Sequence, residues 1–165
     1  MANELLVHLF EHKAWCNRSL AEALKAAPSD ADRREMAVVL FTFGHTAIID
    51  CIFRAHLSGV AHDYADTVPR EHPDLDVLAA AMAETDAWYL EYVASATAEE
   101  LDEVVEFKFV DGDRGRMTKG QMLAHVITHG ASHRGAIGKM LEGLGVAGAS
   151  DMVTTFARRP DAPSR

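Results

Sequence analysis

Apolar residues recur every three or four positions along most of the chain, a spacing typical of helices that bury one face. A first helix is predicted over residues 3–26, just before Pro28. Its main apolar positions are Leu5, Leu6, Leu9, Trp15, Leu20 and Leu24. A second helix, over residues 32–57, is apolar almost all round, so we expect neighbours to bury it on most sides. Gly59 favours a helix end there.

Two more long helices are predicted in the second half of the chain. One covers residues 74–95, where apolar positions again recur at helical spacing. The other has the clearest start, because Thr118 and Gln121 fit the capping box, in which each side chain accepts the other's backbone N–H. We expect this last long helix to end near Gly143 or Gly145.

Shorter elements fill the remaining segments. Thr97 fits the cap of one short helical turn, because carboxylates follow it. Residues 104–110 alternate partly between apolar and polar, and Asp111 with Gly112 is a turn signal, so a small hairpin is predicted. A short last helix is predicted over residues 149–158.

Four long helices in 165 residues predict an all-α fold. We expect a four-helix bundle with a crossover connection and a short extra C-terminal helix, because residues 58–73 are long enough to cross the bundle. The chain has no internal repeat and no linker that would divide it. Residues 1–158 are therefore predicted to form a single domain, followed by a flexible tail at 159–165.

The charge balance argues against a nucleic-acid partner. The chain has 25 acidic and 16 basic residues and a formal net charge of −9 with histidine neutral. Binding to a duplex needs clustered Lys and Arg. Here the basic residues are scattered among the acidic ones, so we expect no nucleic-acid binding.

The ends and the cysteines favour a cytoplasmic protein without a membrane partner. The first residues do not form a signal peptide. No stretch approaches the roughly 18 apolar residues that are needed to span a bilayer. Cys16 and Cys51 form no CxxC pair and are interpreted as reduced residues that serve packing.

Nine histidines are many for this length, and three of them share one predicted helix. His125, His129 and His133 are spaced four apart and therefore lie along one helix face. At about 1.5 Å rise per residue the outer two stand about 12 Å apart, too far for one ion that binds nitrogen at about 2 Å. The spacing allows His125 with His129, or His129 with His133, plus a ligand from another helix.

His45 is the candidate for that further ligand. It lies in the apolar run 40–49 of the second helix, where an imidazole without a partner costs roughly 1–3 kcal/mol. A single buried histidine is more often a hydrogen-bonded core residue than a ligand, but its combination with the HxxxH spacing favours a metal site. Gly44 beside it would let a second backbone or a ligand approach closely.

The other histidines are interpreted as surface residues. His8 and His12 are also four apart, but they are flanked by charged residues that indicate a solvated side of the first helix. These flanking residues are Glu11, Lys13 and Arg18. His56, His62 and His72 lie in or near the 58–73 connection and are expected to be solvated.

Three segments together are similar to the pattern of a known family. Residues 125–137, HVITHGASHRGAI, are similar to an HxxxHxxxHRGQI signature, and residues 9–17, LFEHKAWCN, are similar to an opening LFxYNxWxN. Residues 43–45, FGH, look like a second-helix segment with a single histidine. On these segments the chain resembles the DinB-like (DinB/YfiT-like) family of small metal-binding four-helix bundles, over nearly its whole length.

The resemblance implies a ligand set. It carries metal binding onto His45, His129 and His133, and leaves His125 as a neighbour with a structural or supporting role. Two positions depart from the pattern, because His12 stands where the family has an aromatic residue and a glutamine after HRG is replaced by alanine at 136. Neither departure removes a ligand.

Three neutral imidazoles would leave a divalent ion its full charge and at least one open position, which suits activation of water or a thiol. Some relatives in the resembling family look like transferases that use low-molecular-weight thiols such as mycothiol or bacillithiol. We therefore expect a metal-dependent, thiol-dependent transferase or a hydrolase that acts on a small molecule. The alternative is a non-catalytic metal-binding or stress-response protein, in which a structural site joins two helices.

The metal and the assembly are predicted less directly. Imidazole ligands suit zinc, nickel, copper and iron, and among these we expect zinc or nickel, with a low-molecular-weight thiol as a candidate second cofactor. The second helix is apolar over more than the side that a small bundle buries. Dimers are also common in the resembling family, so a homodimer through helix faces is predicted.

Overall fold

The structure is a computed structural model that describes residues 2–28, 32–149 and 151–160. Its elements in chain order are α1 (Ala2–Lys25), α2 (Arg33–Ser58), α3 (Leu75–Ser95), α4 (Ala98–Asp102), β1 (Val104–Lys108), β2 (Arg114–Thr118), α5 (Lys119–Gly143) and α6 (Val153–Phe156). The mainly helical class expected from the sequence is confirmed. In the part of the chain that is described, the hairpin of β1 and β2 is the one sheet.

Local signals account for where the helices begin and end. At the start of α5, the Thr118 hydroxyl accepts the Gln121 N–H at 3.1 Å, and the Gln121 side chain accepts the Thr118 N–H at 2.8 Å. Thr97 and Glu100 make the same capping box before α4. Gly59 ends α2 with a φ of 68°, a conformation that suits glycine. The predicted bounds of the long helices therefore agree closely with the structure.

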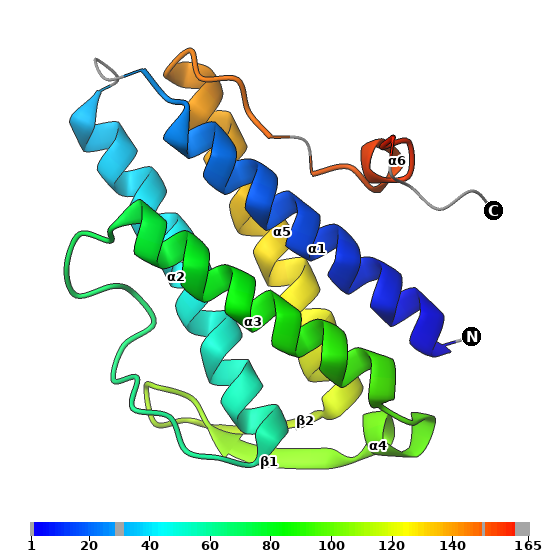
Figure 1. Cartoon of the computed structure of the whole chain (residues 1–165). Helices are drawn as coiled ribbons and strands as arrows, with labels where there is room; N and C mark the ends of the chain where they lie inside the picture. Colours follow the sequence, from blue (N-terminus) through cyan, green and yellow to red (C-terminus); the bar gives the residue numbers. More distant parts are fainter. Residues whose placement is uncertain (1, 29–31, 150, 161–165) are drawn as a thin grey trace.

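The four long helices α1, α2, α3 and α5 lie side by side (Figure 1). Helix α1 packs mainly on α3, and α2 packs mainly on α5. Smaller contacts join α2 to α3 and α1 to α5, so each long helix touches two others. This arrangement sets α2 beside α5, the two helices on which the candidate ligands lie.

Two groups of buried apolar side chains fill the interior, one toward each end of the helices. The first contains Leu20, Val39, Phe43, Leu78, Met82, Ile137 and Leu141. The second contains Phe10, Phe53, Tyr89, Val93, Leu123 and Val126. Each long helix contributes to both groups, and the stretch between its two contributions carries polar residues.

We call these intervening residues the polar layer. They are His12, Lys13 and Asn17 on α1, His45 and Asp50 on α2, Thr85 and Asp86 on α3, and His129, His133 and Arg134 on α5. All of them are buried or half-buried. Because buried polar groups must be paired, this layer is where the fold concentrates its electrostatic interactions.

The connection 59–74 returns along the bundle from the end of α2 to the start of α3, so these two helices point in the same direction (Figure 1). It packs against α2 at Gly44, where an added Cβ would lie 2.5 Å from Pro69 Cγ and 3.3 Å from Pro73 Cγ. The close approach expected at Gly44 is therefore made by proline rings of the connection. A side chain at this position would push the connection away from α2.

The smaller elements follow the sequence with one correction. The predicted hairpin is present, with β1 antiparallel to β2 and Gly112 at a φ of 94° in its turn. The last helix is shorter than predicted, since α6 covers Val153–Phe156 where 149–158 was expected. Of the tail predicted at 159–165, residues 161–165 lie outside the described residues.

Helix α2 is long and apolar enough to cross a membrane when judged by length and composition alone. The expectation that no segment reaches this limit was therefore wrong. The finding is weak support for a membrane span, because a core helix of a bundle has the same composition. In the structure α2 packs against α3 and α5, and its Asp50 is buried in the polar layer.

Candidate metal centre

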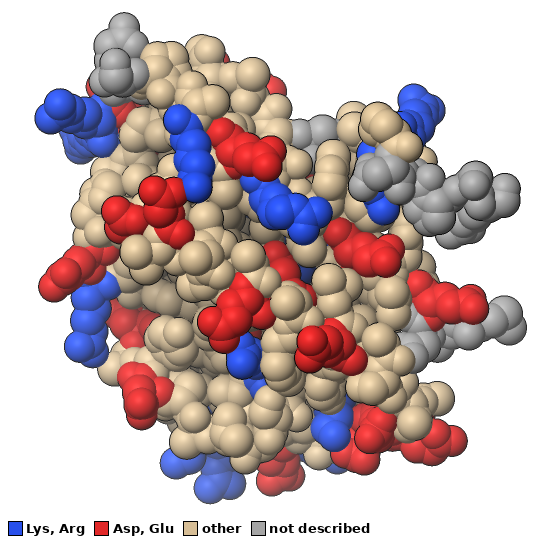
Figure 2. Space-filling model, in the orientation of Figure 1, with Lys and Arg blue, Asp and Glu red and all other residues tan. Residues whose placement is uncertain are grey.

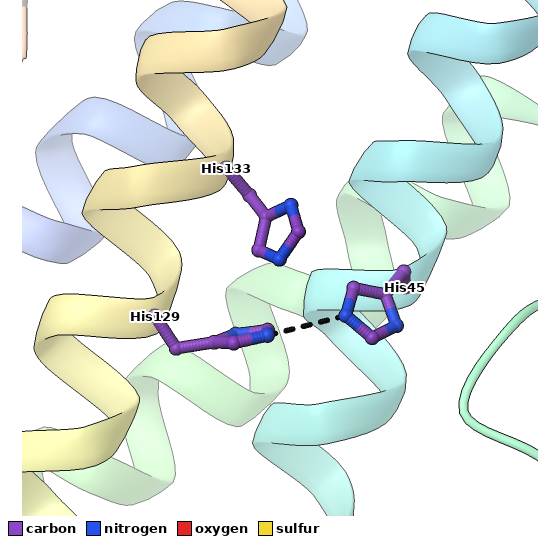
Figure 3. Close-up of side chains that lie close together, drawn as sticks. All are labelled: His45, His129 and His133. Atoms are coloured by element: carbon purple, nitrogen blue, oxygen red, sulfur yellow. Dashed lines mark hydrogen bonds between the residues drawn. The ribbon is translucent and has the colours of Figure 1, made fainter.

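Three imidazoles converge in the half of the polar layer between α2 and α5. Helix α2 supplies His45, and α5 supplies His129 and His133 from successive turns (Figure 3). One ring nitrogen of each lies within 4.8 Å of the others. All three side chains are half-buried. The structure thus brings together the three histidines that the resemblance implied, in an arrangement that can hold a metal ion.

The ring of His45 is oriented by the 59–74 connection. Its Nδ1 lies 2.6 Å from the Thr67 carbonyl oxygen, which can only accept, so Nδ1 carries the proton and donates it. The Asp66 carboxylate in turn accepts the backbone N–H of Thr67 at 2.6 Å and that of Val68 at 3.2 Å. These contacts leave a lone pair on His45 Nε2, which faces α5. Carbonyl partners of this kind commonly orient metal-binding histidines.

The distance between the two helices suits a shared ion. His45 Nε2 lies 3.1 Å from His129 Nε2. Two nitrogens that each bind a tetrahedral ion at about 2 Å stand about 3.3 Å apart. The rings of His129 and His133 have centroids 4.4 Å apart. Small side-chain adjustments would therefore bring all three nitrogens to bonding distance.

The surroundings of the His129 ring favour its neutral form. Its Nδ1 is buried and has no hydrogen-bond partner among the described residues. Burial, with smaller contributions from His133, His45 and His125, lowers the pKa of His129 to about 4. Burial and His45 also lower the pKa of His133. Both rings are therefore neutral near pH 7, which is the state that binds metal.

His125 lies outside this group. Its ring stacks on Phe53 with centroids 4.6 Å apart and on His129 with centroids 5.3 Å apart. Burial lowers its pKa. Although His125 shares a helix face with the other two, its contacts make it a packing neighbour of His129.

The other histidines and cysteines correct the sequence-based interpretation. His12 is buried, at 6% exposure, and its Nε2 lies 3.2 Å from Cys16 Sγ. The ring of Phe156 in α6 covers it, with centroids 5.4 Å apart. The expected solvated face of α1 was therefore wrong at His12, because the C-terminal segment folds over it. No local pattern around His12 indicates this contact.

Lys13 was also expected in water and is instead 1% exposed. Its Nζ lies 2.6 Å from Asp50 Oδ2 and 2.5 Å from Asp86 Oδ1. Burial lowers the pKa of Lys13, but the two carboxylates outweigh burial and leave the pKa above its ordinary value. The sequence gives no local signal of this ion network, since its members come from three different helices.

Of the histidines near the connection, only His72 is exposed as expected. His56 and His62 are half-buried with ring centroids 5.2 Å apart. Burial, with a smaller effect of His62, lowers the pKa of His56. Cys51 is half-buried and its sulfur lies 3.6 Å from the Thr85 hydroxyl, which agrees with its interpretation as a packing residue.

Comparison with known proteins identifies a family over nearly the whole chain. The model of the DinB family matches residues 1–161. The match covers α1 to α6 and so includes all three candidate ligands. A comparison with curated proteins found no match to the chain.

Proposed function

The chain belongs to the DinB family, and from this premise we propose that it binds one divalent metal ion through His45, His129 and His133. We also propose that the fold is a four-helix bundle with a crossover connection, in which α2 and α5 carry the ligands. The observation that carries it is the convergence of three ring nitrogens from two helices within 4.8 Å. Zinc and nickel suit an all-imidazole ligand set.

We further propose that the site is catalytic, in a transferase that uses a low-molecular-weight thiol or in a hydrolase of a small molecule. A divalent ion bound there would act as a Lewis acid that lowers the pKa of a water or thiol in a remaining coordination position. The chain supports this role in two ways. The three rings are half-buried and so stand near solvent. The lowered pKa values of His129 and His133 keep these two ligands uncharged, so they leave the charge of the ion uncompensated.

Metal analysis of single variants tests the ligand set. His45→Ala, His129→Ala and His133→Ala are each expected to lose one equivalent of bound zinc or nickel. His125→Ala is the matched control, because its ring lies on the same helix and stacks on His129 without joining the group. Loss of metal from His125→Ala with retention by His133→Ala would overturn the assignment.

Cobalt spectroscopy tests whether a position is open. In a Cys16→Ser/Cys51→Ser protein, which has no thiol of its own, a thiolate-to-cobalt charge-transfer band must come from an added thiol. We expect added mycothiol or bacillithiol to produce that band, and binding to tighten as pH rises because the thiol loses its proton. A cobalt spectrum indifferent to both thiols and pH would favour the alternative function, a non-catalytic site that joins α2 to α5.

We propose that the chain binds no nucleic acid. On the face drawn in Figure 2, Lys and Arg side chains alternate with Asp and Glu, which supports the expectation of no nucleic-acid partner. We also propose a cytoplasmic homodimer. Val38, an exposed apolar residue of α2, offers a contact point for a second copy. Light scattering that shows a monomer at micromolar concentration would remove the dimer.

A further inference from the structure

A second group of ligand-type side chains lies on the other side of the bundle, between α1 and the C-terminal segment. His12 and Cys16 are one turn apart on α1, and Asp151 precedes α6. One ligand atom of each lies within 4.8 Å of the others. His12 and Cys16 are buried, and Asp151 is half-buried, with 23% of its side chain exposed.

The contacts hold these side chains in place. His12 Nε2 faces Cys16 Sγ at 3.2 Å. Two guanidinium nitrogens of Arg134 each lie 3.1 Å from Asp151 Oδ1, which orients the carboxylate. Phe156 packs on the ring of His12 and so keeps the segment from Asp151 onward against α1. Helix α1 therefore contributes two ligands and the C-terminal segment one, although these segments lie more than a hundred residues apart in the sequence.

Charge around the group also favours a bound cation. Arg134 donates to the Asn17 oxygen, Asn17 donates to Asp86, and Lys13 contacts both Asp86 and Asp50. With Asp151, this connected set contains three carboxylates but only two cationic side chains. When all are ionised, one negative charge is unmatched. Burial raises the pKa of Asp50, so a proton there is the competing way to balance it.

We propose that His12, Cys16 and Asp151 form a second metal site, which binds zinc through one sulfur, one nitrogen and one oxygen. Thiolate with imidazole is a ligand set that zinc favours. On binding, the Cys16 thiol would lose its proton to solvent and bind as thiolate. A divalent ion with one thiolate adds a single positive charge, which matches the unpaired negative charge of the network. The ion would link the segment before α6 to α1.

Without an ion this cysteine has no reactive role. Burial, followed by the hydrogen bond and charge of Asp151, raises the pKa of the Cys16 thiol well above its ordinary value. The thiol is therefore protonated near pH 7, and its 1% exposure leaves no room for a substrate. The same geometry suits a buried ion, which deprotonates a coordinating thiol outright.

The test uses cobalt in a His129→Ala protein, in which the histidine group of α2 and α5 is incomplete. We expect Co²⁺ to produce a thiolate-to-cobalt charge-transfer band. Cys16→Ser in this background should abolish the band. Cys51→Ser, which removes the other cysteine, should keep it and is the matched control. Asp151→Asn should weaken cobalt binding at least tenfold without abolishing the fold.

Two outcomes would overturn the second site. One is a His129→Ala protein that shows no band, and the other is a band that survives Cys16→Ser. Zinc melting curves supply a readout that does not depend on colour, since zinc should raise the Tm of His129→Ala but not of His129→Ala/Cys16→Ser. The wild type should bind two equivalents of zinc. If the three-histidine proposal alone fails, one equivalent that depends on Cys16 remains, so the two proposals fail separately.

Discussion

The polar layer has two halves that handle buried polar groups differently. On the α1 side, Lys13 lies between the carboxylates of Asp50 on α2 and Asp86 on α3, so charges of the chain offset one another. Between α2 and α5, uncharged rings face each other, and His129 Nδ1 has no partner among the described residues. Consecutive residues of α5 serve the two halves, since His133 faces His45 while Arg134 reaches α1.

The paired charges stabilise the fold, whereas the neutral imidazoles are available to bind a ligand. A buried charge must be paired inside the chain, and removal of its partner leaves an uncompensated ion. A neutral imidazole can stay unpaired at a smaller cost and keeps a lone pair for a metal. Changes at the ion pairs of Lys13 should therefore act on stability, and changes at the histidines between α2 and α5 should act mainly on metal binding.

The largest effect is expected for Lys13→Met. It would leave two buried carboxylates without their cation and destabilise the fold by roughly 3–5 kcal/mol in denaturant unfolding. Lys25→Met is the control, because the Lys25–Asp76 pair is exposed and such pairs contribute little. A Lys13→Met protein as stable as the control would show that the network does not hold the bundle together.

Next in size is the loss of metal in His129→Ala. Supporting residues around a metal typically contribute about 10–100-fold to affinity, and loss of a ligand should exceed that range. Without metal, the variant should unfold at nearly the same denaturant concentration as the wild type. The His129 ring that it lacks has a buried nitrogen without a hydrogen-bond partner in the described part of the chain, so its removal costs little stability. If metal-free His129→Ala is as unstable as Lys13→Met, the distinction between the two halves fails.

Between about pH 7 and pH 5, the metal-free protein should lose about 2 kcal/mol of stability through His129. Its pKa is about 4 in the fold and 6.5 for an unperturbed histidine, the value expected in the unfolded chain. The unfolded chain therefore takes up the proton first as pH falls. The contribution to stability is full above pH 6.5 and is lost between 6.5 and 4. Most of the loss, about 2 kcal/mol, falls between about pH 7 and pH 5. Urea unfolding of wild type and His129→Gln at both pH values measures it, and equal losses would refute the assignment.

The smallest effect is expected for Asp66→Ala. Its carboxylate holds the turn that presents the Thr67 carbonyl to His45, so it acts on the metal through two intermediates. We expect metal affinity to fall about 10-fold, at the lower end for supporting residues. Asp63→Ala, an exposed residue of the same connection, should bind metal as the wild type does. Isothermal titration with zinc compares the two, and equal affinities would show that the connection does not orient His45.

The two halves also differ in how far the sequence predicts them. His129 and His133 lie four apart on one helix, so their pairing follows from helix geometry. His45 stood out as a polar residue in an apolar run, and the resemblance selected it. Lys13 gave no such signal, because its neighbours in sequence are consistent with a solvated face. Its partners are 37 and 73 residues away.

The sequence by itself determined the long helices, because apolar spacing and capping residues act over a few positions. It also placed two of the candidate ligands on one helix face. Only the tertiary structure decided that Phe156 covers His12 and that Thr67 orients His45. It likewise decided that Cys16 meets Asp151. These contacts depend on how the connection 59–74 and the C-terminal segment pack across the bundle, and helix propensity carries no information about that packing.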